Sequence, residues 1–138
     1  MDAEKFTKKS LEVIESCEKL AYEYNNQELT QAHLMYALVT VEDSLIAKLL
    51  TNMGINMDAF TGECEKLVAN RPKVSGGQLF TSPEFSKALI QAEKEAKQMG
   101  DDYISVEHIF LGLLEKADKD AVWLQMTWLF WNERKYWT

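Results

Sequence analysis

The feature that most constrains this chain is one helical pattern that occurs twice, 75 residues apart. After Ser105, apolar residues recur at intervals of three and four, the spacing that places them on one helical face. A unit of this kind buries its apolar face against a copy of itself, so two packed copies are predicted. The two matching segments are Leu29-Thr30-Gln31-Ala32-His33-Leu34 and Ile104-Ser105-Val106-Glu107-His108-Ile109.

Capping residues divide the chain into predicted helices. A Ser, Thr, Asp or Asn at the N-cap pairs an orphan backbone N–H, and Gly tolerates the left-handed residue that ends many helices. No stretch shows the period of two that is typical of a strand, so the fold class is all-α. Helices are predicted to begin after Thr7, Thr30, Asp43-Ser44, Asn56 or Asp58, Ser82 and Ser105, and to end at about Tyr24, Gly54 and Gly100.

The apolar residues of each predicted helix define its inward face. Cys17 lies on that face of the first helix and aligns with Ala92 of the other copy, so it is interpreted as a small buried thiol. The third helix presents Leu45, Ile46, Leu49, Leu50 and Met53, and the helix after Ser82 presents Phe85, Ala88, Leu89, Ala92, Ala96 and Met99.

We divide the chain into a first repeat (residues 1–70), a joining loop (71–81), a second repeat (82–121) and a divergent tail (122–138). The loop holds a Pro, a Gly pair and no periodicity. Gly76-Gly77 lacks the surrounding residues of a phosphate-binding loop, so a linker role is favoured.

The tail breaks the repeat. It contains every Trp of the protein, and the last helix of the second repeat is predicted to be altered or missing. Three interpretations stay open: an exposed aromatic patch for a partner, a segment packed on the core, or a sequence of different origin such as a frame-shifted end. The four tryptophans are Trp123, Trp128, Trp131 and Trp137.

Composition narrows the classes of function. The chain has 22 acidic and 15 basic residues, a net charge of −7, so it would repel a phosphate backbone. No apolar run approaches the roughly 20 residues that span a bilayer, and the first residues lack an apolar signal core. We therefore expect a cytoplasmic protein that binds neither nucleic acid nor membrane.

Catalysis and metal binding have little support in the sequence. His33 and His108 occupy the same position in the two copies, but no cluster of Cys, His or carboxylate residues surrounds either one at metal-ligand spacing. No Ser or Cys stands in a nucleophile motif. Packing or capping roles are favoured for both histidines, and no metal, cofactor or catalytic residue is expected.

The motifs together resemble the Clp repeat amino-terminal domain of a ClpB/Hsp104-type AAA+ disaggregase chaperone, over roughly residues 4–121. The resemblance implies a pseudo-twofold bundle of two tandem four-helix repeats that engages unfolded or aggregated polypeptides for a hexameric AAA+ ring. It implies no enzyme activity, because the chain contains no ATPase motif, and a monomer when isolated. The motifs are Phe6-Thr7, Leu29-Thr30, His33-Leu34, Asp43-Ser44-Leu45-Ile46, Met53-Gly54-Ile55, Pro72-Lys73-Val74-Ser75-Gly76-Gly77, Ser82-Pro83 and the stretch 100–108.

The resemblance also implies that Thr7, Asp101 and Glu107 engage the substrate. Each has a structural interpretation as well. Thr7 is an N-cap, Asp101 follows the helix-ending Gly100, and Glu107 lies in a first turn, where a carboxylate gains roughly 0.3–1 kcal/mol from the helix dipole. Both interpretations stay open for all three residues.

An alternative is the adaptor- or phosphoarginine-docking domain of a ClpC/ClpA-type protease chaperone. The related ClpC-type domain reads phosphoarginine with a Gly-Thr-Glu-His motif in both repeats. Here the second copy keeps the carboxylate of Glu107, whereas the first copy has Ala32 in its place. A guanidinium needs an anionic acceptor, so the disaggregase interpretation is favoured.

Overall fold

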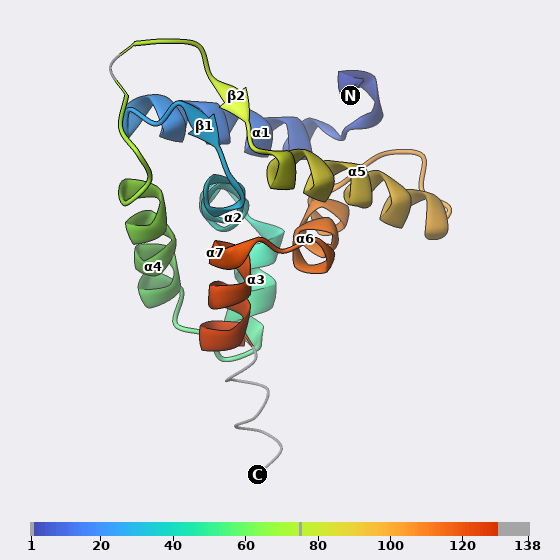
Figure 1. Cartoon of the computed structure of the whole chain (residues 1–138). Coiled ribbons are helices and arrows are strands. Elements are labelled where there is room, and N and C mark those ends of the chain that lie inside the picture. The colour runs from blue at the N-terminus through green and yellow to red at the C-terminus, as the bar shows by residue number, and fades with distance from the viewer. Residues whose placement is uncertain (1, 75, 130–138) are drawn as a thin grey trace.

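The computed structural model describes residues 2–74 and 76–129, and helices make up most of them (Figure 1). A short 3-10 turn, Ala3–Lys5, precedes α1, and a π-helical stretch η2, Gln125–Leu129, continues α7. The all-α prediction is confirmed. Helices α1 to α7 span Lys8–Glu23, Gln31–Thr40, Leu45–Asn52, Met57–Ala69, Pro83–Gln98, Val106–Glu115 and Lys119–Leu124.

Side-chain caps fix where the helices begin. The Thr7 hydroxyl accepts the Ser10 N–H at 3.2 Å and starts α1, and Ser82 accepts the Phe85 N–H at 3.0 Å and starts α5. Asn56 caps α4 through the Ala59 N–H at 3.1 Å, so Asn56 rather than Asp58 opens that helix. These starts agree with the sequence prediction because an N-cap depends only on the residues beside it.

The predicted ends of α1, α3 and α5 are confirmed too. Gly54 and Gly100 follow α3 and α5 with φ angles of 88° and 75°, a conformation that a Cβ disfavours. Asn25 ends α1 with φ 56°. Asn is one of the few other residues that adopt this conformation readily.

Two short parallel strand contacts cross between the repeats. Strand β1 (Glu28–Leu29) pairs with β2 (Phe80–Thr81), with Leu29 opposite Thr81. A single bridge joins Phe6 to Ile104, the same pairing related by the 75-residue shift. These contacts leave the all-α class unchanged, and the sequence gives no sign of them because a pair of two-residue strands is too short to show an alternating pattern.

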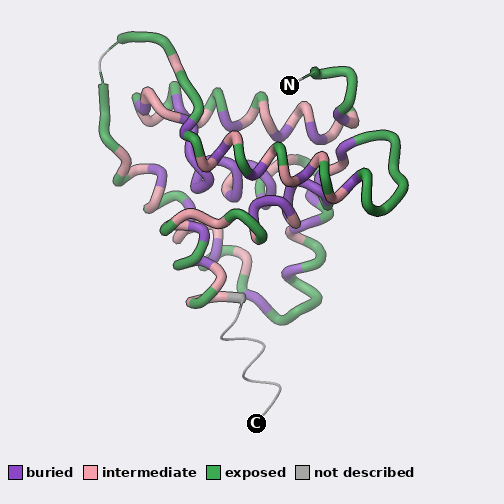
Figure 2. Tube along the Cα trace, turned by 45° about the vertical axis from the view of Figure 1, so that its right-hand side comes forward, coloured by how far each residue is buried: buried purple, intermediate pink, exposed green. Residues whose placement is uncertain are grey.

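The buried residues gather in the middle of the molecule, between its outer helices (Figure 2). α2 and α6 lie centrally, with α1 and α5 across one side of them and α3, α4 and α7 across the other (Figure 1). Cys17 and Ala92, equivalent residues of α1 and α5, are both fully buried, which confirms the buried thiol. Burial raises the pKa of that thiol, so it stays protonated. Met99, predicted to face inward, is exposed.

The two repeats differ in how closely their paired helices approach. Gly112 of α6 aligns with Ala37 of α2, and a Cβ at Gly112 would stand 2.7 Å from the Ala92 backbone nitrogen. α5 therefore crosses α6 at a distance that only glycine permits.

α3 buries one side and exposes the other. Ile46 and Leu50 are each 1% exposed, whereas Leu45 and Leu49 are 49% and 46% exposed. The apolar residues that the sequence presents on this helix therefore do not share one buried face.

The tail begins inside a helix, because α7 runs past residue 121 to Leu124. Leu124 is fully buried, and the Trp128 ring meets Phe60 edge-on, with the ring centroids 6.0 Å apart. Trp123 is exposed and donates to the Glu63 carboxylate at 3.2 Å. Of the three interpretations of the tail, packing on the core therefore holds for Leu124 and Trp128. Trp131 and Trp137 lie outside the described residues. The division into repeats, loop and tail stays a prediction.

None of the helices in the described ranges is both long enough and apolar enough to span a bilayer.

Candidate functional site

His108, in the first turn of α6, organises a polar network in the second repeat. Its Nδ1 accepts the backbone N–H of Ser105 at 2.9 Å, so the proton of the neutral ring lies on Nε2. Nε2 donates to the Asp101 carboxylate at 2.9 Å. The ring therefore joins the helix start to the loop before it and holds Asp101 in place.

Glu107 belongs to the same network. The Ser105 hydroxyl donates to the Glu107 carboxylate at 2.9 Å and lies 2.9 Å from His108 Nδ1. The His108 side chain is only 4% exposed, whereas that of Asp101 is 51% exposed and Glu107 is exposed too. The network thus presents two carboxylates to solvent on a buried support.

Thr7 is held against the backbone of this network. Its N–H donates to the Ile104 carbonyl at 3.0 Å, and the Ser10 hydroxyl donates to the same carbonyl at 2.7 Å. Since Ser105 follows Ile104 directly, Thr7, Asp101 and Glu107 are linked through a few contacts. The N-cap role of Thr7 is confirmed, and the substrate-engaging role of the three residues stays a prediction.

An exposed aromatic lies in the same connection between α5 and α6. Tyr103 is 58% exposed, and it stands between Asp101 and the paired Ile104. Sequence reasoning missed it as a surface residue. Its position in a turn, directly after two aspartates, is the signal that points to exposure.

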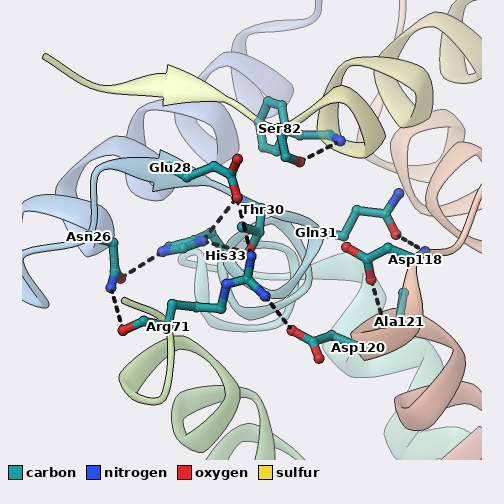
Figure 3. A network of polar contacts seen from close by, with 11 residues as sticks. Asn26, Glu28, Thr30, Gln31, His33, Arg71, Ser82, Asp118, Asp120 and Ala121 are labelled. Atoms are coloured by element: carbon teal, nitrogen blue, oxygen red, sulfur yellow. Dashed lines mark hydrogen bonds and ion pairs between the residues drawn. The ribbon is translucent and has the colours of Figure 1, made fainter. Parts of the chain in front are cut away.

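The first repeat contains the equivalent network in a different chemical form (Figure 3). His33 Nδ1 accepts the Thr30 N–H at 3.0 Å, and His33 Nε2 donates to the Asn26 side-chain oxygen at 2.9 Å. The 75-residue shift pairs Asn26 with Asp101, so an amide replaces the carboxylate. All three residues of the first network are buried.

The buried setting changes the acid-base properties of His33. Burial, and secondarily the charge of Arg71, lower the pKa of its ring from 6.5 to about 4. The capping roles expected for both histidines are confirmed by the bonds to Thr30 and Ser105. Across residues 2–74 and 76–129, no three His, Cys, Asp or Glu side chains are grouped as a metal site would need.

Arg71 and Gln31 join the first network to the second repeat (Figure 3). Arg71 lies 3.2 Å from the Glu28 carboxylate and 3.7 Å from that of Asp120, at the start of α7. The fully buried Gln31 amide donates to the Glu84 and Lys116 carbonyls and accepts the Asp118 N–H at 2.8 Å. The first network is therefore part of an internal joint between the repeats.

Two hollows lie beside this joint. The smaller, about 230 Å³ and lined by Asn26, Arg71 and Phe80 among others, is below the roughly 300–1,000 Å³ that is usual for small-molecule pockets. The larger, about 510 Å³, is lined by Arg71, Asp118 and Asp120 among others, and these side chains already bond within the joint, Arg71 to Asp120 and Asp118 to the Ala121 N–H. We take the exposed carboxylates of the second repeat as the candidate site.

Comparison with known proteins identifies the family of this chain. A family model for the Clp repeat (R) N-terminal domain matches residues 5–126. The chain belongs to this family. Its fold agrees, since the N-terminal domain of Hsp104 from Candida albicans superimposes with a TM-score of 0.80 at 20% identity, covering 89% of this chain and 81% of that one. The resemblance drawn from the sequence motifs is confirmed.

Relatives by sequence carry the name chaperone protein ClpB. That of Nitratidesulfovibrio vulgaris is 40% identical over 121 residues, which is 84% of this chain and 14% of that protein. That of Clostridium tetani is 39% identical over 120 residues, 83% of this chain and 14% of the relative. The Clp repeat chain described here thus spans 14% of the length of these ClpB proteins.

Proposed function

We propose that this chain is the non-catalytic, substrate-binding amino-terminal domain of a ClpB-type disaggregase. It engages unfolded or aggregated polypeptides in the cytoplasm and passes them to a hexameric AAA+ ring, and the isolated domain is a monomer. Membership of the Clp repeat family and the ClpB relatives support this assignment.

The observation that carries the proposal is the pair of exposed carboxylates, Asp101 and Glu107, fixed by His108 and Ser105. Because these contacts already order both side chains, binding a client loses little further side-chain entropy. Carboxylates beside the exposed Tyr103 suit extended segments that carry basic and apolar side chains. Binding is weak, since an unfolded client must itself be ordered.

The phosphoarginine-docking alternative requires an anionic site in each repeat. The 75-residue shift replaces Asp101 with the buried Asn26 and Glu107 with Ala32. The first repeat therefore has no carboxylate at either position with which to bind a guanidinium. This difference favours client binding by the second repeat alone.

The test is an amide NMR titration of the full chain with reduced, carbamidomethylated lysozyme, an unfolded basic polypeptide, with and without free phosphoarginine. We expect shifts around Thr7, Asp101 and Glu107 with the polypeptide alone. Shifts that occur only with phosphoarginine, or that cluster around His33, would assign the domain to the protease-docking class.

Equivalent residues supply matched variants. Glu107→Ala gives the second repeat the residue of the first, and we expect about three- to tenfold weaker client binding. Thr7→Ala and Ser82→Ala remove equivalent N-caps, each costing about 1 kcal/mol of stability, but only Thr7→Ala is expected to weaken binding. Equal loss of binding in the two cap variants would mean that Thr7 acts only through the fold.

A further inference from the structure

The outer side of α3 presents an apolar surface of the first repeat. Leu45 and Leu49, one helical turn apart, are 49% and 46% exposed. Lys48, the only charged residue of α3, is exposed beside them. An apolar pair with one cation is a small surface, and the second repeat shows what covers its equivalent.

α7 with η2 is the counterpart of α3 under the 75-residue shift, and α4 covers it. Phe60 of α4 contacts the Trp128 ring, and Glu63 of α4 accepts the Trp123 N–H at 3.2 Å. Leu124, the equivalent of Leu49, is fully buried, whereas Leu49 is 46% exposed. The amphipathic helix α4 therefore packs against α7 and η2, whereas the equivalent side of α3 leaves Leu49 exposed.

The helix contacts follow the same symmetry. α2 contacts α7 and α4, and α6 contacts α3. A helix equivalent to α4 would therefore lie against α3 and α6. On α6 it would meet Leu111, the half-buried equivalent of Tyr36. Burial and, after it, the charge of Glu65 on α4 raise the pKa of Tyr36, so that side chain lies near α4.

The chain itself does not repeat the anchoring residues of α4. The 75-residue shift places Asn132 and Lys135 at the positions of Met57 and Phe60. Phe60 is fully buried and Met57 packs partly buried against the core, so both positions require apolar side chains. The amino acids at 132 and 135 do not meet this requirement.

We propose that Leu45, Lys48 and Leu49 of α3, with Leu111 of α6, form a docking surface for an amphipathic α-helix of a partner polypeptide. We name these four residues the α3 surface. The partner helix carries an aromatic anchor at the position of Phe60. Three residues later, at the position of Glu63, it carries an acid, because Lys48 occupies the place of Trp123. The α3 surface adjoins the client site on α6, where Leu111 follows Glu107 by one helical turn, and differs from it by its three residues on α3.

The test uses a synthetic peptide of residues 56–70, the sequence of α4, with Cys64→Ser to prevent oxidation. Titrated into the full chain, it should shift amide signals of Leu45–Asn52 and of Leu111. Leu49→Asp should weaken binding about tenfold or more, and Lys48→Glu about threefold. A peptide carrying Glu63→Lys should recover its affinity for Lys48→Glu.

Controls separate the α3 surface from folding and from the client site. Leu49 and Leu45 are half-exposed, so Leu49→Asp and Leu45→Asp should keep the helical circular dichroism of the parent. Asp101→Asn, in the connection before α6, should leave peptide binding unchanged, and Leu49→Asp should leave binding of unfolded lysozyme unchanged. A joint loss would mean that one surface serves both ligands and would overturn this proposal.

Three outcomes would overturn it directly. Peptide-induced shifts that avoid α3 would exclude the α3 surface. If Leu49→Asp alone shifts the signals of residues 130–138, the chain's own tail is the occupant. If sedimentation shows a dimer that Leu49→Asp dissociates, the occupant is a second copy of the chain.

Discussion

The two histidine networks share one backbone plan but differ in what they expose. In the first repeat, Asn26, Thr30 and His33 are no more than 5% exposed, and neither equivalent of the two acids bears a charge. In the second, Asp101 is 51% exposed and His108 only 4%. The histidine is therefore the common structural element, and the residue on its Nε2 sets the difference.

This difference shows how a duplicated unit acquires separate roles. Asn26 donates to the Pro72 carbonyl at 3.3 Å while it accepts from His33, a double task that an amide performs and a carboxylate does not. Asp101 meets solvent instead, where a carboxylate costs little to keep charged. The first network is built for joining the repeats and the second for a charged surface.

The largest expected effect comes from removing each histidine. His33→Ala leaves the Thr30 N–H and the Asn26 oxygen buried without their partner and opens a cavity, so we expect a loss of about 3–4 kcal/mol. His108→Ala should lose about 1–2 kcal/mol, because water can solvate Asp101. Urea denaturation followed by far-ultraviolet circular dichroism at pH 7.5 measures both. Equal losses would contradict the contrast between buried and open networks.

The second effect is sensitivity to acid. The pKa of His33 is lowered to about 4 in the folded chain, so between pH 6.5 and 4 the unfolded chain binds more protons. The stability contributed by neutral His33 is fully present above pH 6.5 and is lost as the pH falls toward 4. The expected loss from this residue is roughly 2–3 kcal/mol.

Urea titrations at several pH values between 7.5 and 4.5 measure this loss. His33→Gln serves as the control, since a glutamine oxygen can accept the Thr30 N–H without titrating. The variant should show a flatter decline than the parent chain. Parallel curves would place the acid-sensitive group elsewhere.

The smallest change in stability is expected when the second histidine network is given the side chain of the first. Asp101→Asn gives the second network the chemistry of the first while keeping an acceptor for His108. We expect a stability change within about 0.5 kcal/mol, because the site is half exposed, but weaker binding of unfolded lysozyme. A melting curve and the NMR titration measure the two quantities. Unchanged client binding would remove Asp101 from the proposed site.

Local chemistry explains which parts of the fold the sequence predicts. Thr7, Ser82 and Gly54 act on the turn beside them, so the corresponding helix ends are confirmed. The repeat itself was visible because matching residues stand at a fixed spacing. The family followed from the same motifs, and the family model confirms it.

Contacts between distant residues account for what the sequence did not show. The pairing of Phe6 with Ile104 depends on how the repeats are placed, and no local pattern specifies it. The exposure of Leu49 depends on which helix lies nearby. For the candidate site, the sequence motifs point to Asp101 and Glu107. They do not show that Ser105 holds Glu107 and His108 holds Asp101 in one network.

The crossed strand contacts have a consequence for synthesis of the chain. Because Thr7 is anchored to the Ile104 carbonyl, the start of α1 lacks this partner until the ribosome has made most of the second repeat. β1 likewise has no strand partner until Phe80 and Thr81 have been synthesised. The nascent first repeat therefore leaves the ribosome with two open backbone edges, which the joining loop and then the second repeat close as they emerge.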